Sequence, residues 1–136
     1  MDFPGYQLPE ELQLLQRTVR RIIQEEIVPL EHSMDPEATE LDDANWQRLA
    51  TMHQNAGLWA FGAPQEYGGG GLSTFAYCVV LEEMAQHRNG LYNPGYATFG
   101  RYPPNVCYAG SPEQMQRYVI PTIREAKKAF FAITEP

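Results

Sequence analysis

The first candidate for chemistry in this sequence is a glycine-rich stretch, EYGGGG, at residues 66–71. The backbone amides of such a run can cradle a phosphate at the start of a helix, and Ser73 could cap that helix. The spacing fits neither GxGxxG within a βαβ unit nor GxxxxGK[ST], because no lysine stands where a P-loop needs one. We therefore favour the interpretation that residues 66–71 form a flexible loop between packed helices.

Two adjacent carboxylates, Glu82 and Glu83, could act as a general acid and base. Adjacent residues of a helix point about 100° apart, so these two cannot serve one reacting centre. We expect one of them to be solvated and the other to pair with a basic residue of a neighbouring helix.

The histidines and cysteines show no metal-binding or catalytic spacing. HExxH, HxH and CxxC are all absent, and no Ser or Cys can be linked to a His and an acid. His53 falls on the apolar face of a predicted helix, which is typical of a hydrogen-bonded core or interface histidine. Cys78 lies in an apolar helix and is expected to be a small buried residue. The sequence thus predicts no metal site and no complete catalytic set.

The elements that would hold these residues are mostly helical. Apolar residues recur at steps of three and four over residues 9–30, and Pro29 is expected to end that helix. A second helix is expected from residues 42–43 to a C-cap at Gly57. A third, over residues 74–88, is apolar on most sides, so we expect it to be central and buried.

The later elements are shorter. Residues 93–110 could carry a short helix interrupted at residues 103–104, which are both proline. Ser111 at the N-cap and Gln114 at the third helical position form a capping box. Pro121 is expected to break that helix, with a last turn or two before the terminal segment.

The terminal segment, AFFAITEP, reads as a β-strand without a partner earlier in the chain. We predict an all-α fold: an orthogonal or up-and-down bundle of five to six helices over residues 1–128, ending in one β-strand. Residues 129–136 would be that strand, the first of a β-domain that this chain lacks, so we expect the chain to be part of a longer protein. The alternative is that residues 129–134 end a helix.

Composition excludes several classes of protein. The chain has 136 residues, 10 Lys and Arg, 17 Asp and Glu, and a net charge of −7. Acidic chains are poor general binders of nucleic acid and anionic membranes, so we expect neither as a partner. No signal peptide and no apolar run of membrane-spanning length is found, and a cytoplasmic location is the expectation.

Three motifs carry a resemblance to a known family. The stretch GLWAFGAPQEYGGGGLSTFAYCVVLEEMA resembles the acyl-CoA dehydrogenase signature, a short apolar segment followed by P-x-E-Y-G-G, G-L-S and a helix with paired acids. AGSPEQMQRYVIPTI resembles the helix that follows in that family, and FFAITEP resembles F-A-[MI]-T-E-P, which opens its β-domain. The motifs occur in the family's order and spacing over roughly residues 6–136.

The resemblance implies a three-domain flavoprotein of which this chain is the N-terminal helical domain. In the family, FAD lies between the β-domain and the C-terminal helices. A glutamate base removes the α-proton of an acyl-CoA thioester, the β-hydrogen passes to the flavin as hydride, and a trans-2-enoyl-CoA results. The resemblance places that glutamate outside this chain, so no catalytic residue is expected here.

Two sets of site residues follow from the resemblance. Phe131, Ile133 and Thr134 match family positions that contact the flavin ring, with the threonine hydroxyl bonding a flavin heteroatom. The alternative for Thr134 is a β-branched residue that ends a strand.

Residues 96–104 match the wall of the family's acyl pocket, where Tyr96, Phe99 and Tyr102 are the expected substrate contacts. The two prolines at 103–104 depart from the commoner helical pattern and leave the acyl preference open.

The expected partners are an acyl-CoA substrate, electron-transfer flavoprotein or a similar acceptor, and further copies of the chain at full length. The chain alone is expected neither to retain FAD nor to turn over substrate. The alternative hypothesis is a stand-alone helical interaction module, or a half-length subunit completed by a partner chain.

Overall fold

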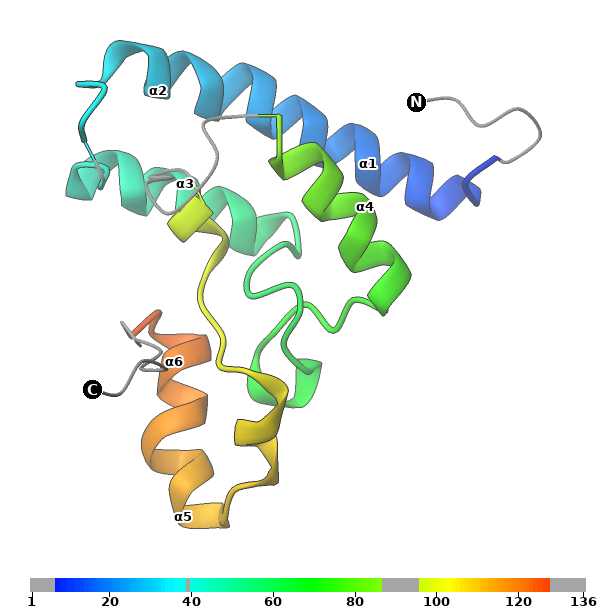
Figure 1. The fold of residues 1–136 in the computed structure, drawn as a ribbon, viewed down its shortest axis with the longest axis vertical. Coiled ribbons are helices and arrows are strands. Elements are labelled where there is room, and N and C mark those ends of the chain that lie inside the picture. The colour runs from blue at the N-terminus through cyan, green and yellow to red at the C-terminus, as the bar shows by residue number, and fades with distance from the viewer. Residues whose placement is uncertain (1–6, 39, 87–95, 128–136) are drawn as a thin grey trace, which may run out of the picture. The chain divides into compact units, whose positions relative to one another are not determined.

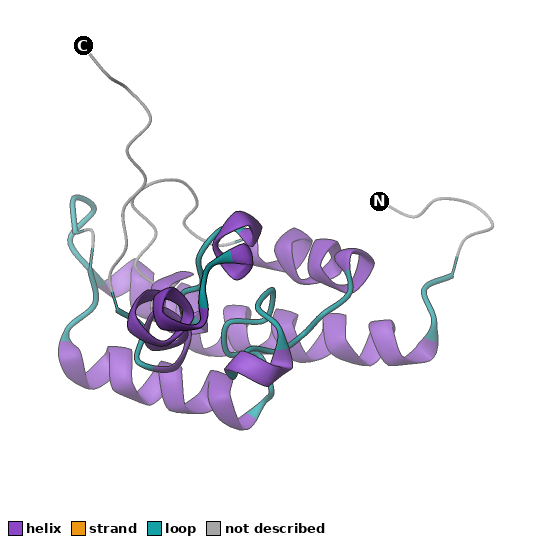
Figure 2. Cartoon of the chain, turned by 90° about the horizontal axis from the view of Figure 1, so that it is seen from below, coloured by secondary structure: helices purple, strands orange, loops and turns teal. Residues whose placement is uncertain are grey.

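The computed structural model describes residues 7–38, 40–86 and 96–127, which form helices, turns and loops without a strand among them (Figure 2). The chain divides into two compact units. The first unit comprises Met1–Asp42 and Ser73–Tyr96, and the second comprises Asp43–Leu72 and Ala97–Pro136. Each unit is therefore assembled from two separate stretches of sequence.

The first unit begins with one continuous helix, made of α1 (Glu10–Ile22), a π-helical turn η1 (Ile23–Ile27) and α2 (Val28–Ser33) (Figure 1). The prediction that Pro29 ends this helix is wrong. The amide of Val28 bonds the carbonyl of Ile23, five residues back, so the turn before the proline is widened. Such a turn makes room for the proline ring and absorbs its missing N–H, and the helix continues to Ser33.

The second helix of this unit, α4 (Thr74–Met84), packs against α1. Ser73 caps it by accepting the amide of Ala76 at 3.3 Å, as expected. The expectations that α4 is central and buried and that Cys78 is a small buried residue are wrong, because only one face of α4 is covered and Cys78 is exposed. A helix that is apolar nearly all round does not indicate by its sequence which side faces its neighbour.

The second unit starts with α3 (Asp43–Asn55), which ends as predicted at Gly57. Gly57 has a φ of 69°, a left-handed conformation that glycine adopts without strain. The amide of Leu58 bonds the carbonyl of His53 at 2.8 Å, and the amide of Gly57 bonds that of Gln54 at 3.1 Å. This pair of bonds is a Schellman motif, and it turns the chain sharply after His53.

Three short 3-10 segments follow in the second unit and at its junction with the first: η2 (Gln65–Tyr67), η3 (Tyr96–Phe99) and η4 (Asn105–Ala109). They lead to a last continuous helix, made of α5 (Pro112–Gln114), the π-helical η5 (Met115–Val119) and α6 (Ile120–Arg124).

The predicted capping box of this last helix is confirmed. Ser111 accepts the amide of Gln114, and the Gln114 side chain accepts the amide of Ser111. The expected break at Pro121 does not occur. As before Pro29, the ladder widens by one residue, with the amide of Ile120 bonding the carbonyl of Met115.

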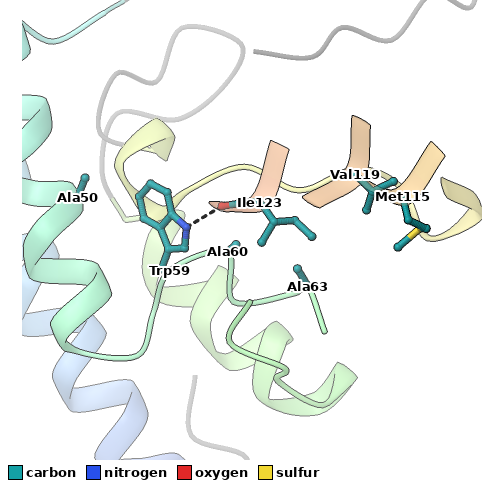
Figure 3. Close-up of a cluster of buried hydrophobic side chains, with 7 residues drawn as sticks. All are labelled: Ala50, Trp59, Ala60, Ala63, Met115, Val119 and Ile123. Carbon is teal, nitrogen blue, oxygen red and sulfur yellow. Dashed lines mark hydrogen bonds between the residues drawn. The ribbon is translucent and has the colours of Figure 1, made fainter. Parts of the chain in front are cut away.

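The second unit is centred on a buried cluster around Trp59 (Figure 3). The indole N–H of Trp59 donates to the carbonyl of Ile123 at 2.8 Å, which ties the segment after α3 to the last helix. The rings of Trp59 and Trp46 also meet edge to face, with centroids 6.3 Å apart. The buried members of the cluster are Ala50, Trp59, Ala60, Ala63, Met115, Val119 and Ile123.

The all-α class is confirmed for the described residues. The predicted number of five to six helices is not confirmed: with each unbroken run of turns taken once, residues 7–38, 40–86 and 96–127 contain four helices, at 10–33, 43–55, 74–84 and 112–124. The predicted strand at residues 129–134 lies outside the described residues.

Candidate functional site

The segment that includes Phe99 and Tyr102 is fixed to the stretch that follows α3. The amide of Ala60 donates to the carbonyl of Phe99 at 2.6 Å. Gly100, with a φ of 83°, turns the chain beside Trp59, and a Cβ there would come within 2.9 Å of the indole ring. A side chain at position 100 would therefore be strained and would also collide with Trp59.

His53 holds the same segment from the end of α3. Its Nε2 lies 2.9 Å from Oγ1 of Thr98, and its ring stacks on Phe99 with centroids 3.7 Å apart and planes at 16°. His53 and Thr98 are completely buried, and Phe99 is 1% exposed. His53 at the end of α3 thus packs against Thr98 and Phe99, which lie far from it in the sequence.

Burial sets the charge of His53. Desolvation lowers its pKa from 6.5 to about 4, so the ring is neutral at neutral pH. Its Nδ1 has no hydrogen-bond partner among the described residues. Because a buried N–H without a partner is less favourable than a buried lone pair, we infer that the proton is on Nε2, which donates to Thr98.

Phe61 connects the two expected pocket residues of this unit. Its ring meets Phe99 edge-on, with centroids 6.1 Å apart and planes at 90°, and it meets Tyr102 at 6.1 Å and 69°. Phe61 is fully buried, whereas Tyr102 is half-buried. Edge-to-face contacts of this kind are favourable and orient rings relative to one another. Phe99 therefore lies in the interior, and Tyr102 is the ring of the three that reaches the surface of the unit.

The glycine run does not present a free cradle for phosphate. The amides of Gly69, Gly70, Gly71 and Leu72 donate to carbonyls of the 60–64 stretch at distances of 2.8 to 3.2 Å. A nest that binds an anion needs its N–H groups unoccupied. The run is a loop between helices, as expected, and it is hydrogen-bonded along its length to the segment that carries Phe61.

The two adjacent carboxylates behave as expected. Glu82 is exposed, whereas Glu83 is buried and accepts two hydrogen bonds from Arg20 of α1, at 2.8 Å and 2.6 Å. Gln86 donates a third hydrogen bond to Glu83. The hydrogen bonds and the charge of Glu83 raise the pKa of the Arg20 guanidinium. Glu83 is thus a structural ion-pair partner of Arg20.

The structure places only part of the predicted site. Phe99 and Tyr102 come together through Phe61, while Tyr96 opens η3 and its side chain is not described. The expected flavin contacts, Phe131, Ile133 and Thr134, lie outside the described residues.

Two contributors were missed from the sequence. Thr98 holds His53 although 45 positions separate them, and Gly62 lies beneath the ring of Tyr102. No local pattern marks either residue, because both roles depend on partners that the fold brings from elsewhere in the chain.

Other kinds of site find no support in the described part of the chain. It contains no group of three or more His, Cys, Asp and Glu residues that could hold a metal ion. None of its helices is long and apolar enough to cross a membrane.

In the second unit, the buried ring of Phe61 thus lies between buried Phe99 and the half-buried ring of Tyr102. The chain belongs to the acyl-CoA dehydrogenase family, because the family described as "Acyl-CoA dehydrogenase, N-terminal domain" matches residues 9–126.

Curated relatives agree with this assignment. (R)-Benzylsuccinyl-CoA dehydrogenase of Thauera aromatica is 32% identical over 147 residues, which cover 100% of this chain and 35% of the relative. Short-chain specific acyl-CoA dehydrogenase, mitochondrial, of Sus scrofa is 29% identical over 137 residues, with 98% and 31% covered. 3-(Aryl)acrylate reductase of Clostridium sporogenes (strain ATCC 15579) is 30% identical over 129 residues, with 93% and 32% covered. The chain spans about a third of the length of these relatives. No solved structure matches the chain significantly.

Proposed function

We propose that this domain forms one wall of the acyl-group site in an FAD-dependent acyl-CoA dehydrogenase. The observation that carries the proposal is the aromatic contact in which Tyr102 reaches the surface while Phe61 and Phe99 support it from below. The aromatic rings of this contact suit the hydrocarbon part of a thioester, since they exclude water from it.

Each residue of this wall has a distinct task. Tyr102 contacts the acyl group, and Phe99 supports Tyr102 through Phe61. Tyr96 is the second substrate contact that we assign. His53 positions Phe99, because the imidazole stacks on the phenyl ring and is itself held by the hydrogen bond to Thr98.

The cofactor and the other partners belong to the same proposal. Phe131, Ile133 and Thr134 are the residues of this chain that we assign to the flavin ring of FAD, which would supply the acceptor for the β-hydrogen. The α-proton goes to a glutamate outside the N-terminal domain. Electron-transfer flavoprotein or a similar acceptor is the redox partner that we assign, and the full-length protein would assemble as a homo-oligomer.

The substrate class is acyl-CoA thioesters. The relatives named above include one with a benzylsuccinyl-CoA name and one with a short-chain name. The proposal therefore covers both aryl-bearing and short aliphatic acyl groups.

The test uses the complete gene product that contains this chain. We expect a visible flavin spectrum, binding of acyl-CoA thioesters by isothermal titration calorimetry, and reduction of a dye that depends on acyl-CoA. Replacing Tyr102 with Ala should weaken acyl-CoA binding without loss of flavin absorbance. A complete gene product that binds flavin but no acyl-CoA would contradict the proposal. A chain that forms a stable complex with an unrelated protein and lacks both ligands would favour the interaction module instead.

A further inference from the structure

Gly62 lies beneath the ring of Tyr102, and the contact leaves no room for a side chain at position 62. A Cβ atom there would lie 2.6 Å from Oη of Tyr102, 2.7 Å from Cζ and 2.9 Å from Cε2. Real Cβ atoms essentially never approach other atoms within 3.0 Å. The φ of Gly62 lies outside the left-handed region, so its backbone does not require glycine. The three atoms nearest to such a Cβ all belong to Tyr102, so a side chain at position 62 would meet the tyrosine ring first.

The backbone around Gly62 is held more firmly than the ring of Tyr102, so it is less able to move to accommodate a larger residue. Phe61 is 1% exposed, and its carbonyl accepts the amide of Leu72 at 3.0 Å. The neighbouring amide of Ala60 is bonded to Phe99 at 2.6 Å. Tyr102 is only half-buried, so a new side chain at position 62 would move the tyrosine ring rather than the chain beneath it.

We propose that Gly62 is a specificity-determining residue of the acyl site, because it lets the ring of Tyr102 lie low and keeps the space above it open for bulky acyl groups. This inference rests on the proposed function, in which Tyr102 contacts the acyl group. Gly62 lies against the hydroxyl end of the ring, and the Phe61 ring meets it at an angle of 69°. We place the acyl group on the side of the ring away from Gly62, so a ring displaced from Gly62 moves into the acyl group's space.

The substrates affected are those whose acyl group is large close to this wall, such as phenyl-bearing thioesters. A short straight chain needs less of the space that a displaced ring would occupy. Exclusion by a difference of about one methylene group changes discrimination by roughly 10- to 200-fold in apolar pockets.

The test measures dissociation constants on the complete gene product by isothermal titration calorimetry, with butanoyl-CoA and 3-phenylpropanoyl-CoA as ligands. In Gly62→Ala, the dissociation constant of the phenyl thioester should rise about tenfold or more, and that of butanoyl-CoA should change much less. Gly110→Ala is the matched control: its φ of −68° accepts alanine, and its nearest contacts, at 3.2 Å, need to shift by only a few tenths of an ångström. Both constants should be unchanged in the control.

A second pair of variants links the effect to the tyrosine. In a Tyr102→Leu background the obstructing ring is gone, so adding Gly62→Ala should leave both constants where Tyr102→Leu alone puts them. If Gly62→Ala proves unable to fold, the same contact predicts that Tyr102→Leu restores folding of the double variant, as followed by circular dichroism.

The possible results separate the two proposals. A wild-type protein that binds neither thioester overturns the proposed function and this inference with it. A wild-type protein that binds both, with an unchanged ratio of constants in Gly62→Ala, overturns the role of Gly62 and leaves the acyl site standing. An equal effect of Gly62→Ala with and without Tyr102 also overturns it.

Discussion

His53 is neutral inside the second unit because its surroundings replace water with Phe99 and one hydroxyl group. Desolvation lowers the pKa of its imidazole to about 4, while in the unfolded chain the group titrates near 6.5. The unfolded state therefore binds more protons than the folded state between these values. The contribution of His53 to the free energy of unfolding is therefore highest above pH 6.5 and falls as the pH drops toward 4. Below about pH 4 both states are protonated, and this contribution changes little further.

We expect this histidine to contribute a pH-dependent loss of about 3 kcal/mol in the free energy of unfolding between pH 7 and pH 4. His53→Gln keeps a donor for Thr98 but has no charge to gain, so its loss over the same range should be smaller by that amount. Urea unfolding at a series of pH values measures both proteins. Parallel pH profiles for the two would show that the ring is charged or exposed in the folded state.

The character of His53 could be predicted from its place on an apolar helix face, and its burial confirms that prediction. Its partner Thr98 could not, since a hydroxyl group 45 residues away gives no local signal. The assignment of Phe99 came only from a resemblance, which gave no reason for its stack on His53. Residue types thus indicate which side chains are buried, and only the fold indicates which of them meet.

At the scale of elements, α1 and α4 are joined by a polar contact within an apolar interface. Glu83 is 1% exposed, and Arg20 reaches it with both ends of its guanidinium fork while remaining 46% exposed itself. Bidentate geometry makes such pairs strong, but the exposed arginine reduces the net gain.

Arg20→Met should lower the free energy of unfolding by about 2 kcal/mol, because it leaves a buried carboxylate with one fewer partner. Urea unfolding followed by circular dichroism measures the loss. Arg21→Met, at the exposed neighbouring position, should stay within about 0.5 kcal/mol of wild type. Adding Glu83→Gln to Arg20→Met should recover part of the loss, since it removes the stranded charge. A double variant less stable than Arg20→Met would contradict this account.

In the second unit, Trp59 connects the segment after α3 to the last helix. Trp59→Phe removes the N–H donor to Ile123 and part of a buried ring, and we expect a loss of about 2 kcal/mol in unfolding free energy. Trp46→Phe is the comparison, because it alters the same edge-to-face pair without removing that bond. Its expected loss is about 1 kcal/mol. Equal losses for the two variants would show that the hydrogen bond from Trp59 to Ile123 does not contribute to stability.

Helix starts were easier to predict than helix ends. Ser73 and Ser111 cap their helices as the local pattern indicates, since a cap depends on three or four neighbouring residues. Pro29 and Pro121 did not end theirs. A proline forbids one hydrogen bond, and tertiary packing on both sides can keep the helix going through a widened turn.

At the scale of the whole molecule, two units assembled from alternating stretches of sequence carry a family relationship over residues 9–126. The family and the helical class could be predicted from the sequence, because three motifs and the apolar periodicity span nearly all of it. The division into two units could not, since it depends on which helices pack together rather than on any boundary in composition.

We expect the isolated 136-residue chain to hold no flavin after purification and to reduce no dye with acyl-CoA, whereas the complete gene product does both. The physical reason is that a wall on one side of a substrate can neither enclose it nor supply the base and the hydride acceptor. Visible absorbance and a dye-reduction assay measure the two properties. Turnover by the isolated chain at a rate near that of the complete gene product would refute this expectation.

The two widened turns bear on how this chain is compared with others. Each one is equivalent to a single residue inserted into an α-helix, and it rotates everything after it by about 100° relative to an unbroken helix. A related helix without the π-helical turn would have one residue fewer. After the turn, its inward-facing positions would match those of this chain only if the alignment were shifted by one residue. Alignments drawn through residues 23–27 and 115–119 without a gap would therefore pair inward-facing positions with outward-facing ones.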